Sequence, residues 1–133
     1  ATGAGAAVVA RRLVRDCESL ASLDQAIATT ASGEPAVLVV SFSTTWCGPC
    51  KVMEPKVSEL SEAYAGRATF LQVMGDKSEN DGIAIMKREG IRTVPLYQIY
   101  KGGQLVDAVS GADPEALTRT IERHAQYACG TVD

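Results

Sequence analysis

The chain of 133 residues lacks the features of several specialised protein classes. No apolar run comes near the roughly 20 residues that a membrane-spanning helix requires. The 13 lysine and arginine residues are dispersed and are outnumbered by 16 acidic residues, so they form no basic footprint. We therefore expect neither nucleic acid nor a membrane as a partner, and the length fits one globular domain.

Metal-ligating residues are also scarce. The chain has one histidine and four cysteines, and among the cysteines only Cys47 and Cys50 are close together. A zinc site needs a second close pair, and a domain of this size needs no disulfide scaffold. We expect no metal and no other cofactor. The simpler interpretation is a redox dithiol at 47 and 50, with Cys17 and Cys129 as bystander thiols.

The first twelve residues, ATGAGAAVVARR, are rich in alanine and glycine and contain no acidic residue. This segment is too weakly apolar for a secretory signal. We predict that residues 1–10 form a disordered extension and that residues 11–133 form a single domain. Two origins of the extension stay open: the stub of a removed organellar transit peptide, or an ordinary disordered chain end.

Apolar periodicity predicts alternating strands and helices. The run AVLVVSF at 36–42 is β-branched and aromatic, which favours a central strand covered on both faces. Further strands are predicted at 11–15, 68–74, 96–100 and 104–109, and helices at 51–64, at 80–88, from Ser22 to Gly33 and from Pro114 onward. This order, βαβαβαββα, predicts an α/β fold with a central mixed sheet flanked by helices.

Local signals support several of these boundaries. Ser22 with a glutamine three residues on has the form of a capping box, and Asp113 before a proline suits the start of the last helix. Pro55 falls inside the helical pattern at 51–64 and should kink it. The glycines of the segment 101–103 permit the positive φ angles of a hairpin turn.

The position of the cysteine pair has a direct chemical consequence. Cys47 follows the central strand and begins a helix, where unpaired amides and the helix dipole stabilise a thiolate. Cys50 lies one helical turn later, within bridging reach. A thiolate at 47 can attack a target disulfide to form a mixed disulfide, and Cys50 can then attack Cys47 and release the reduced target.

Four features together resemble the thioredoxin family: WCGPCK at 46–51, Pro55 five residues after Cys50, Thr93-Val94-Pro95 before a strand, and Gly111-Ala112 after the hairpin. The resemblance covers roughly residues 11–126. It implies the thioredoxin fold and a protein-disulfide reductase that works by thiol–disulfide exchange without a cofactor. An oxidant or isomerase of the same fold is the alternative within that class, and Gly-Pro between the cysteines argues against it.

The resemblance also implies residue roles. Cys47 resembles the attacking thiol and Cys50 the resolving one, and Pro95 resembles the family's cis-proline beside the dithiol. Val94, after Thr93, resembles the position that pairs with an extended target peptide. The apolar docking rim is implied at Trp46, Gly48, Pro49, Gly111 and Ala112.

Partners and compartment follow from the same resemblance. We expect disulfide-containing target proteins, a thioredoxin reductase as electron donor, and a monomer. The region after Cys50 looks like plastid f-type thioredoxins, and the segment 75–82, about four residues longer than is typical, is similar to plastid drought-stress-type proteins. We therefore expect the chloroplast stroma, with the cytoplasm as the alternative. We interpret 75–82 as a solvated insertion, with a target-selecting element as the alternative.

Two positions depart from the family pattern. Thioredoxins usually carry a buried aspartate six residues before the attacking cysteine, where this chain has Ser41, and often a lysine where it has Gln72. Removing both members of a buried ion pair avoids leaving one uncompensated. A hydroxyl is no base near neutral pH, although a water held by Ser41 could relay a proton. We expect resolution by Cys50 to be slower than in an aspartate-bearing relative; the alternative is that another group or bulk water deprotonates Cys50 adequately. A target-binding module with little turnover is the alternative function.

The remaining candidates receive structural interpretations. His124 is assigned to a solvated helix face. Tyr97, Tyr100 and Phe42 have strand spacing and are assigned to the core.

Overall fold

The structure is a computed structural model that describes residues 13–33, 35–77 and 79–125. The predicted disordered extension at 1–10 and Cys129 lie outside these residues. The strands are β2 (Val14–Asp16), β3 (Val37–Ser43), β4 (Ala68–Met74), β5 (Leu96–Lys101) and β6 (Gln104–Ser110), and the helices are α2 (Leu20–Thr29), the short 3₁₀ helix η2 (Thr30–Ser32), α3 (Gly48–Ala63), α4 (Gly82–Arg88) and α5 (Pro114–Ala125). The predicted order βαβαβαββα is confirmed.

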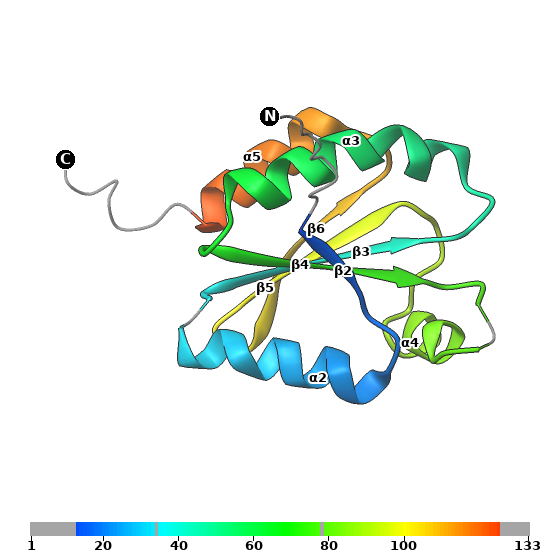
Figure 1. Ribbon diagram of the computed structural model, residues 1–133, viewed down its shortest axis with the longest axis horizontal. Coiled ribbons are helices and arrows are strands. Elements are labelled where there is room, and N and C mark those ends of the chain that lie inside the picture. Colours follow the sequence, from blue (N-terminus) through cyan, green and yellow to red (C-terminus); the bar gives the residue numbers. More distant parts are fainter. Residues whose placement is uncertain (1–12, 34, 78, 126–133) are drawn as a thin grey trace, which may run out of the picture.

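The five strands form one mixed sheet in the order β2-β4-β3-β5-β6. The central strand β3 pairs in parallel with β4 and antiparallel with β5, and all seven of its residues are buried. Helices α3 and α5 cover one face of the sheet, and α2 and α4 cover the other (Figure 1). The predicted α/β fold is therefore confirmed, because a strand buried on both faces requires helices on both sides.

Alternation along β3 builds two cores. Val37 and Val39 point into the core beneath α3 and α5, whereas Leu38, Val40 and Phe42 point into the core on the α2 side. Ser41 continues the first series and so lies on the α3 face, directly opposite Gln72 in the register between β3 and β4. A polar pair thus follows the apolar residues Val37 and Val39 on this face.

The start of α2 differs from the capping-box prediction. Ser19 caps this helix, and its hydroxyl accepts from the Ser22 N–H at 3.0 Å. Ser22 lies inside the first turn, where its N–H is one of the unpaired donors that a cap satisfies. A second N–H of the first turn, that of Leu20, donates to Asp81 Oδ2 at 2.8 Å, and this acceptor lies far along the chain.

Other local predictions are confirmed. The Asp113 carboxylate accepts from the Ala116 N–H at 3.0 Å at the start of α5. Gly102 and Gly103 have φ angles of 65° and 81° in the β5–β6 turn, a region that favours glycine. Helix α3 begins at Gly48, earlier than predicted, and runs through Pro55. Among the described residues, no helix combines the length and apolarity needed to cross a bilayer.

Candidate active site

The two close cysteines lie where the central strand gives way to α3. After β3 ends at Ser43, the Cys47 N–H donates to the Thr44 carbonyl and closes a turn. Cys47 is the N-cap residue of α3, with extended backbone angles, and it is joined to Cys50 by a disulfide with the Cα atoms 5.3 Å apart. The position of Cys47 at a helix start and the bridging reach of Cys50 agree with the sequence analysis, although the helix begins before the predicted bound at 51.

The N-terminus of α3 favours negative charge on the Cys47 sulfur. Its Sγ accepts from the Cys50 N–H at 3.1 Å, in the place where a serine or aspartate oxygen acts in an ordinary N-cap. Gly48 and Pro49 are the first helical residues, and proline suits this turn because its missing N–H would have had no partner there. In the reduced protein, this amide and the helix dipole stabilise a thiolate at Cys47.

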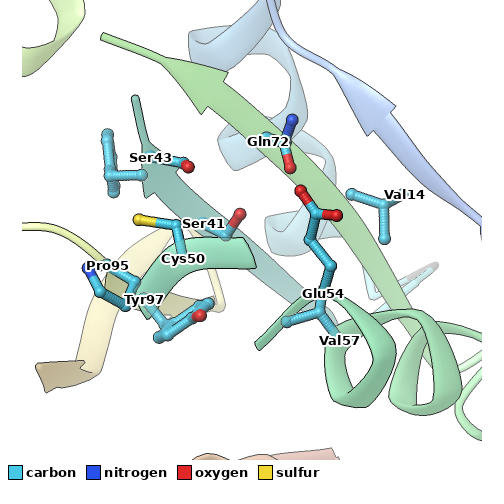
Figure 2. A pocket seen from close by; sticks show the side chains of 10 residues that line it. Val14, Ser41, Ser43, Cys50, Glu54, Val57, Gln72, Pro95 and Tyr97 are labelled. Carbon is cyan, nitrogen blue, oxygen red and sulfur yellow. The ribbon is translucent and has the colours of Figure 1, made fainter. Parts of the chain in front are cut away.

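A second segment faces the dithiol. The Val94–Pro95 peptide bond is cis, and Pro95 lines the same small cavity as Cys50 (Figure 2). The Pro95 carbonyl accepts from the Gly111 N–H at 2.9 Å, which ties the segment after β6 to this loop. No hydrogen bond among the described residues uses the backbone of Val94. Its N–H and carbonyl are therefore available to an extended peptide.

Exposure divides the predicted site residues into two groups. Cys47 and Cys50 are only 3% and 6% exposed, whereas Trp46 is 73% exposed. Gly48, Pro49, Thr93 and Ala112 are exposed, and Val94 and Gly111 are half-buried. Any protein that reacts with the dithiol must therefore first contact this surrounding surface.

Behind Cys50 lies a cavity of about 20 Å³. Ser41 and Gln72, the two positions that depart from the family pattern, contribute polar groups to its wall. Glu54 of α3 also lines it, and sequence reasoning missed this residue. The available signal was the spacing, because a residue four positions after Cys50 lies on the same helix face.

The segment 75–82 is anchored rather than merely solvated. Asp76 accepts from both the N–H and the hydroxyl of Thr45, next to Trp46, and the hydroxyl bond is 2.6 Å long. These bonds lower the pKa of Asp76. At the other end of the segment, Asp81 accepts from Leu20 and its N–H donates to the Glu18 carbonyl. The segment therefore contacts both loops that carry described cysteines.

Cys17 is buried and free. Its Sγ lies 3.7 Å from the Ser19 carbonyl, in donor geometry, and burial raises the pKa of its thiol. The assignment of His124 to a solvated face is wrong, because its Nε2 lies 3.0 Å from Asp107 Oδ2 and its side chain is only 18% exposed. Since α5 packs beside β6, a histidine near its end reaches the strand.

The core assignments of Phe42, Tyr97 and Tyr100 are confirmed, since all three are buried. Within 13–125, positions 34 and 78 excepted, no three histidine, cysteine, aspartate or glutamate side chains gather in a way that could hold a metal ion.

Comparison with known proteins agrees with this geometry. The thioredoxin family model matches residues 17–123. Thioredoxin 1 of Nostoc sp. is 41% identical over 88 residues, which cover 65% of this chain and 78% of that protein. The chloroplastic F-type thioredoxin of Mesembryanthemum crystallinum is 45% identical over 96 residues, covering 72% of this chain and 47% of that relative.

A solved structure of a complex between ferredoxin:thioredoxin reductase and thioredoxin f2 matches with a TM-score of 0.71 and 32% identity, covering 86% of this chain and 97% of that one. The mixed sheet and the cysteine pair at a helix start define a dithiol–disulfide oxidoreductase. The chain belongs to the thioredoxin family, whose members exchange electrons with protein disulfides. The resemblance predicted from WCGPCK is confirmed.

Proposed function

We propose that this protein reduces disulfide bonds in target proteins, with Cys47 as the attacking thiol and Cys50 as the resolving thiol. The observation that carries the proposal is the hydrogen bond from the Cys50 N–H to Cys47 Sγ at the start of α3. It singles out Cys47 as the sulfur better able to hold negative charge. The more nucleophilic sulfur should be the one that meets the target disulfide.

The reaction has two exchange steps. The Cys47 thiolate attacks one sulfur of the target disulfide, so a mixed disulfide forms and one target thiolate leaves. Cys50 then attacks Cys47 Sγ, the bond between Cys47 and the target breaks, and the second target thiolate leaves. The product is the Cys47–Cys50 disulfide present in the structure. An external dithiol or a reductase must return two electrons before the next turnover.

Target recognition is assigned to the surface around the dithiol. An extended segment of the target pairs with the free backbone groups of Val94, between Thr93 and the cis-proline Pro95. Apolar target side chains contact Trp46, which is 73% exposed, together with Gly48, Pro49, Gly111 and Ala112. Backbone pairing gives affinity for many sequences, which suits an enzyme with several targets.

The electron donor and the compartment are further parts of the proposal. A thioredoxin reductase supplies the electrons, supported by the likeness to the thioredoxin f2 of the reductase complex. The chloroplast stroma is the proposed compartment, supported by the likeness to a chloroplastic F-type protein. The protein is proposed to act as a monomer.

Reduction of insulin with dithiothreitol as donor tests the activity. We expect turnover in the wild type and none in Cys47→Ser. The Cys50→Ser variant should trap targets as mixed disulfides on Cys47, which mass spectrometry of the captured peptides locates. Equal turnover of wild type and Cys50→Ser would contradict the proposal.

A second candidate function, favoured by Ser41, is that of a target-binding module with slow turnover. Its support is that Ser41 brings no carboxylate to the cavity behind Cys50. Stopped-flow reduction of a disulfide by wild type and Ser41→Asp compares the two. Fast wild-type turnover that the added carboxylate does not accelerate excludes the module.

A further inference from the structure

The cavity behind Cys50 has the size and polarity of a site for one water molecule. Its volume of about 20 Å³ exceeds the 10–15 Å³ or so that a single water needs. Cys50, Ser41, Gln72 and Glu54 all contribute polar atoms to its wall. A buried water typically makes two to four hydrogen bonds, and this wall offers that number of partners.

The Ser41 hydroxyl is available as one of these partners. Ser41 is 6% exposed, and no hydrogen bond to its side chain occurs among the described residues. Figure 2 shows this hydroxyl pointing into the space between Cys50 and Glu54. A water at this point can hydrogen-bond the Ser41 hydroxyl, and it lies in the same cavity as Cys50.

Only one lining residue can accept a proton from that water near neutral pH. The titratable residues of the lining are Cys50, Glu54 and Tyr97. Burial raises the pKa of Tyr97 to about 12, so this phenol stays protonated. The lining residues of β2, β3 and β4 carry no charge, and Pro95, just before β5, carries none. Glu54 is therefore the available carboxylate.

The Glu54 carboxylate is also not engaged by another described side chain. Its carboxylate has no hydrogen bond and no ion pair among the described residues, whereas Glu59 on the same helix pairs with Lys56 at 3.2 Å. Figure 2 shows the Glu54 carboxylate directed toward Gln72 across the cavity. The residue as a whole is exposed, so a proton taken from the cavity side can pass on to bulk water.

We propose that Glu54 accepts the proton of the Cys50 thiol, through one water held by Ser41, when Cys50 resolves the mixed disulfide. The inference rests on the proposed function, in which Cys50 is the resolving thiol. It revises the expectation from Ser41 alone, since the carboxylate reaches the cavity from helix α3 instead of strand β3.

The step balances as follows. The mixed disulfide joins Cys47 Sγ to the target sulfur, and Cys50 carries a proton. Cys50 sulfur forms a bond to Cys47 Sγ, the bond between Cys47 and the target breaks, and the target leaves as a thiolate. The proton of Cys50 moves to the water, and a proton of that water moves to Glu54. In the reverse direction, protonated Glu54 returns a proton to Cys50 as the internal disulfide opens.

The test compares Glu54→Gln with Glu62→Gln, a matched change of an exposed glutamate near the other end of α3. Reduced protein is mixed with a disulfide peptide in excess, the reaction is stopped with acid, and mass spectrometry counts the mixed disulfide over time. We expect resolution about 10- to 100-fold slower in Glu54→Gln near pH 6, with mixed disulfide accumulating, and no change in Glu62→Gln.

Two further readouts separate proton transfer from a structural effect. The deficit of Glu54→Gln should shrink toward about pH 9, where hydroxide removes the Cys50 proton directly. Formation of the mixed disulfide, which uses Cys47 alone, should keep its wild-type rate. Adding Ser41→Asp to Glu54→Gln should restore resolution, because it returns a carboxylate to the same cavity.

Equal resolution rates for wild type and Glu54→Gln near pH 6 overturn the inference, as does an equal loss in Glu62→Gln. The proposed function fails by a different result. If Cys50→Ser releases the target as fast as the wild type, Cys50 is not the resolving thiol. If Cys50 is required and Glu54→Gln has no effect, only the role of Glu54 is lost.

Discussion

Cys17 and Cys47 are equally buried, at 3% exposure each, yet their surroundings give the two sulfurs opposite chemistry. Cys47 Sγ accepts a hydrogen bond from a helix N-terminus. Cys17 Sγ is placed to donate one to the Ser19 carbonyl. An acceptor sulfur is stabilised as a thiolate, whereas a donor sulfur must keep its proton to keep its bond.

Charge strengthens the difference. Burial is the main cause of the raised pKa of Cys17; the Ser19 backbone offsets part of this effect, and the nearby carboxylates of Asp24, Asp81 and Glu18 add to it. The first turn of α3, by contrast, contains no acidic residue. Their equal exposure alone would predict equal reactivity for the two thiols, so the electrostatic surroundings decide which one reacts.

The largest expected effect is on turnover. Cys47→Ser should lower disulfide reduction by about 10³-fold or more, because the hydroxyl cannot replace the thiolate nucleophile. Cys17→Ser should leave it within about twofold, since this thiol takes no part in exchange. Insulin reduction with both purified variants measures the difference in turnover, and an equal loss in Cys17→Ser would contradict the prediction.

Alkylation of the reduced protein should separate the thiols next. At neutral pH we expect iodoacetamide to modify Cys47 about 100-fold faster than Cys17, because the thiolate reacts and the raised pKa of Cys17 keeps that thiol protonated. Timed labelling followed by peptide mass spectrometry measures both rates in one sample. Comparable rates would show that burial outweighs the helix terminus.

The two ends of segment 75–82 offer a finer test of the difference between the two cysteine loops. Asp76 accepts hydrogen bonds from Thr45 in the Cys47 loop, and Asp81 accepts one from Leu20, which follows the Cys17 loop. Asp81→Ala should cost about 1 kcal/mol of unfolding free energy, since it leaves the Leu20 N–H at the start of α2 without its acceptor. Turnover should stay near wild type. Urea denaturation of the oxidised protein measures the loss.

Asp76→Ala should have the reverse profile, with a smaller change in stability and reduced turnover, because Thr45 next to Trp46 loses its acceptor. The bonds that lower the pKa of Asp76 are present above the ordinary aspartate pKa and are lost as pH falls through the lowered value. A decrease in turnover for Asp81→Ala alone would reverse the assignment of the two ends.

The smallest effect concerns pH and Cys17. A thiol with a raised folded-state pKa contributes stability that is present below its unfolded value of 9.0 and is lost as pH rises beyond it. In the oxidised protein, where Cys47 and Cys50 do not titrate, the wild type should lose more stability than Cys17→Ala between about pH 8 and 10. Parallel denaturation curves at both pH values measure the difference, and equal losses would contradict it.

Much of the fold was predictable because its signals are local. The strand at 68–74 was predicted with its observed bounds, and Asp113 was recognised as a cap. Ser22 was assigned the cap that Ser19 provides, because Ser22 has a glutamine three residues on and only the backbone angles and hydrogen bonds show that Ser19 precedes the helix. His124 was misplaced for a related reason, since its partner Asp107 lies 17 residues away on a strand.

The candidate site divides in the same way. The spacing of Cys47 and Cys50, the strand before them and the helix after them are properties of one short stretch, and they predicted the dithiol correctly. The cavity behind Cys50 combines β2, β3, α3, β4 and β5, so no single stretch of sequence describes it. The expectation of slow resolution, which was based on Ser41 alone, therefore did not take Glu54 into account.

By itself, the sequence determined the family, the order of the elements and the dithiol at 46–51, because these depend on residues within one or two turns of each other. Only the tertiary structure decided that Glu54 shares a cavity with Ser41 and Gln72, and which aspartate accepts hydrogen bonds from each cysteine loop. Those relations join residues far apart in the chain, such as Leu20 and Asp81, which are 61 positions apart. The packing of α3 on the sheet, and not the row that contains Ser41, brings a carboxylate to the cavity.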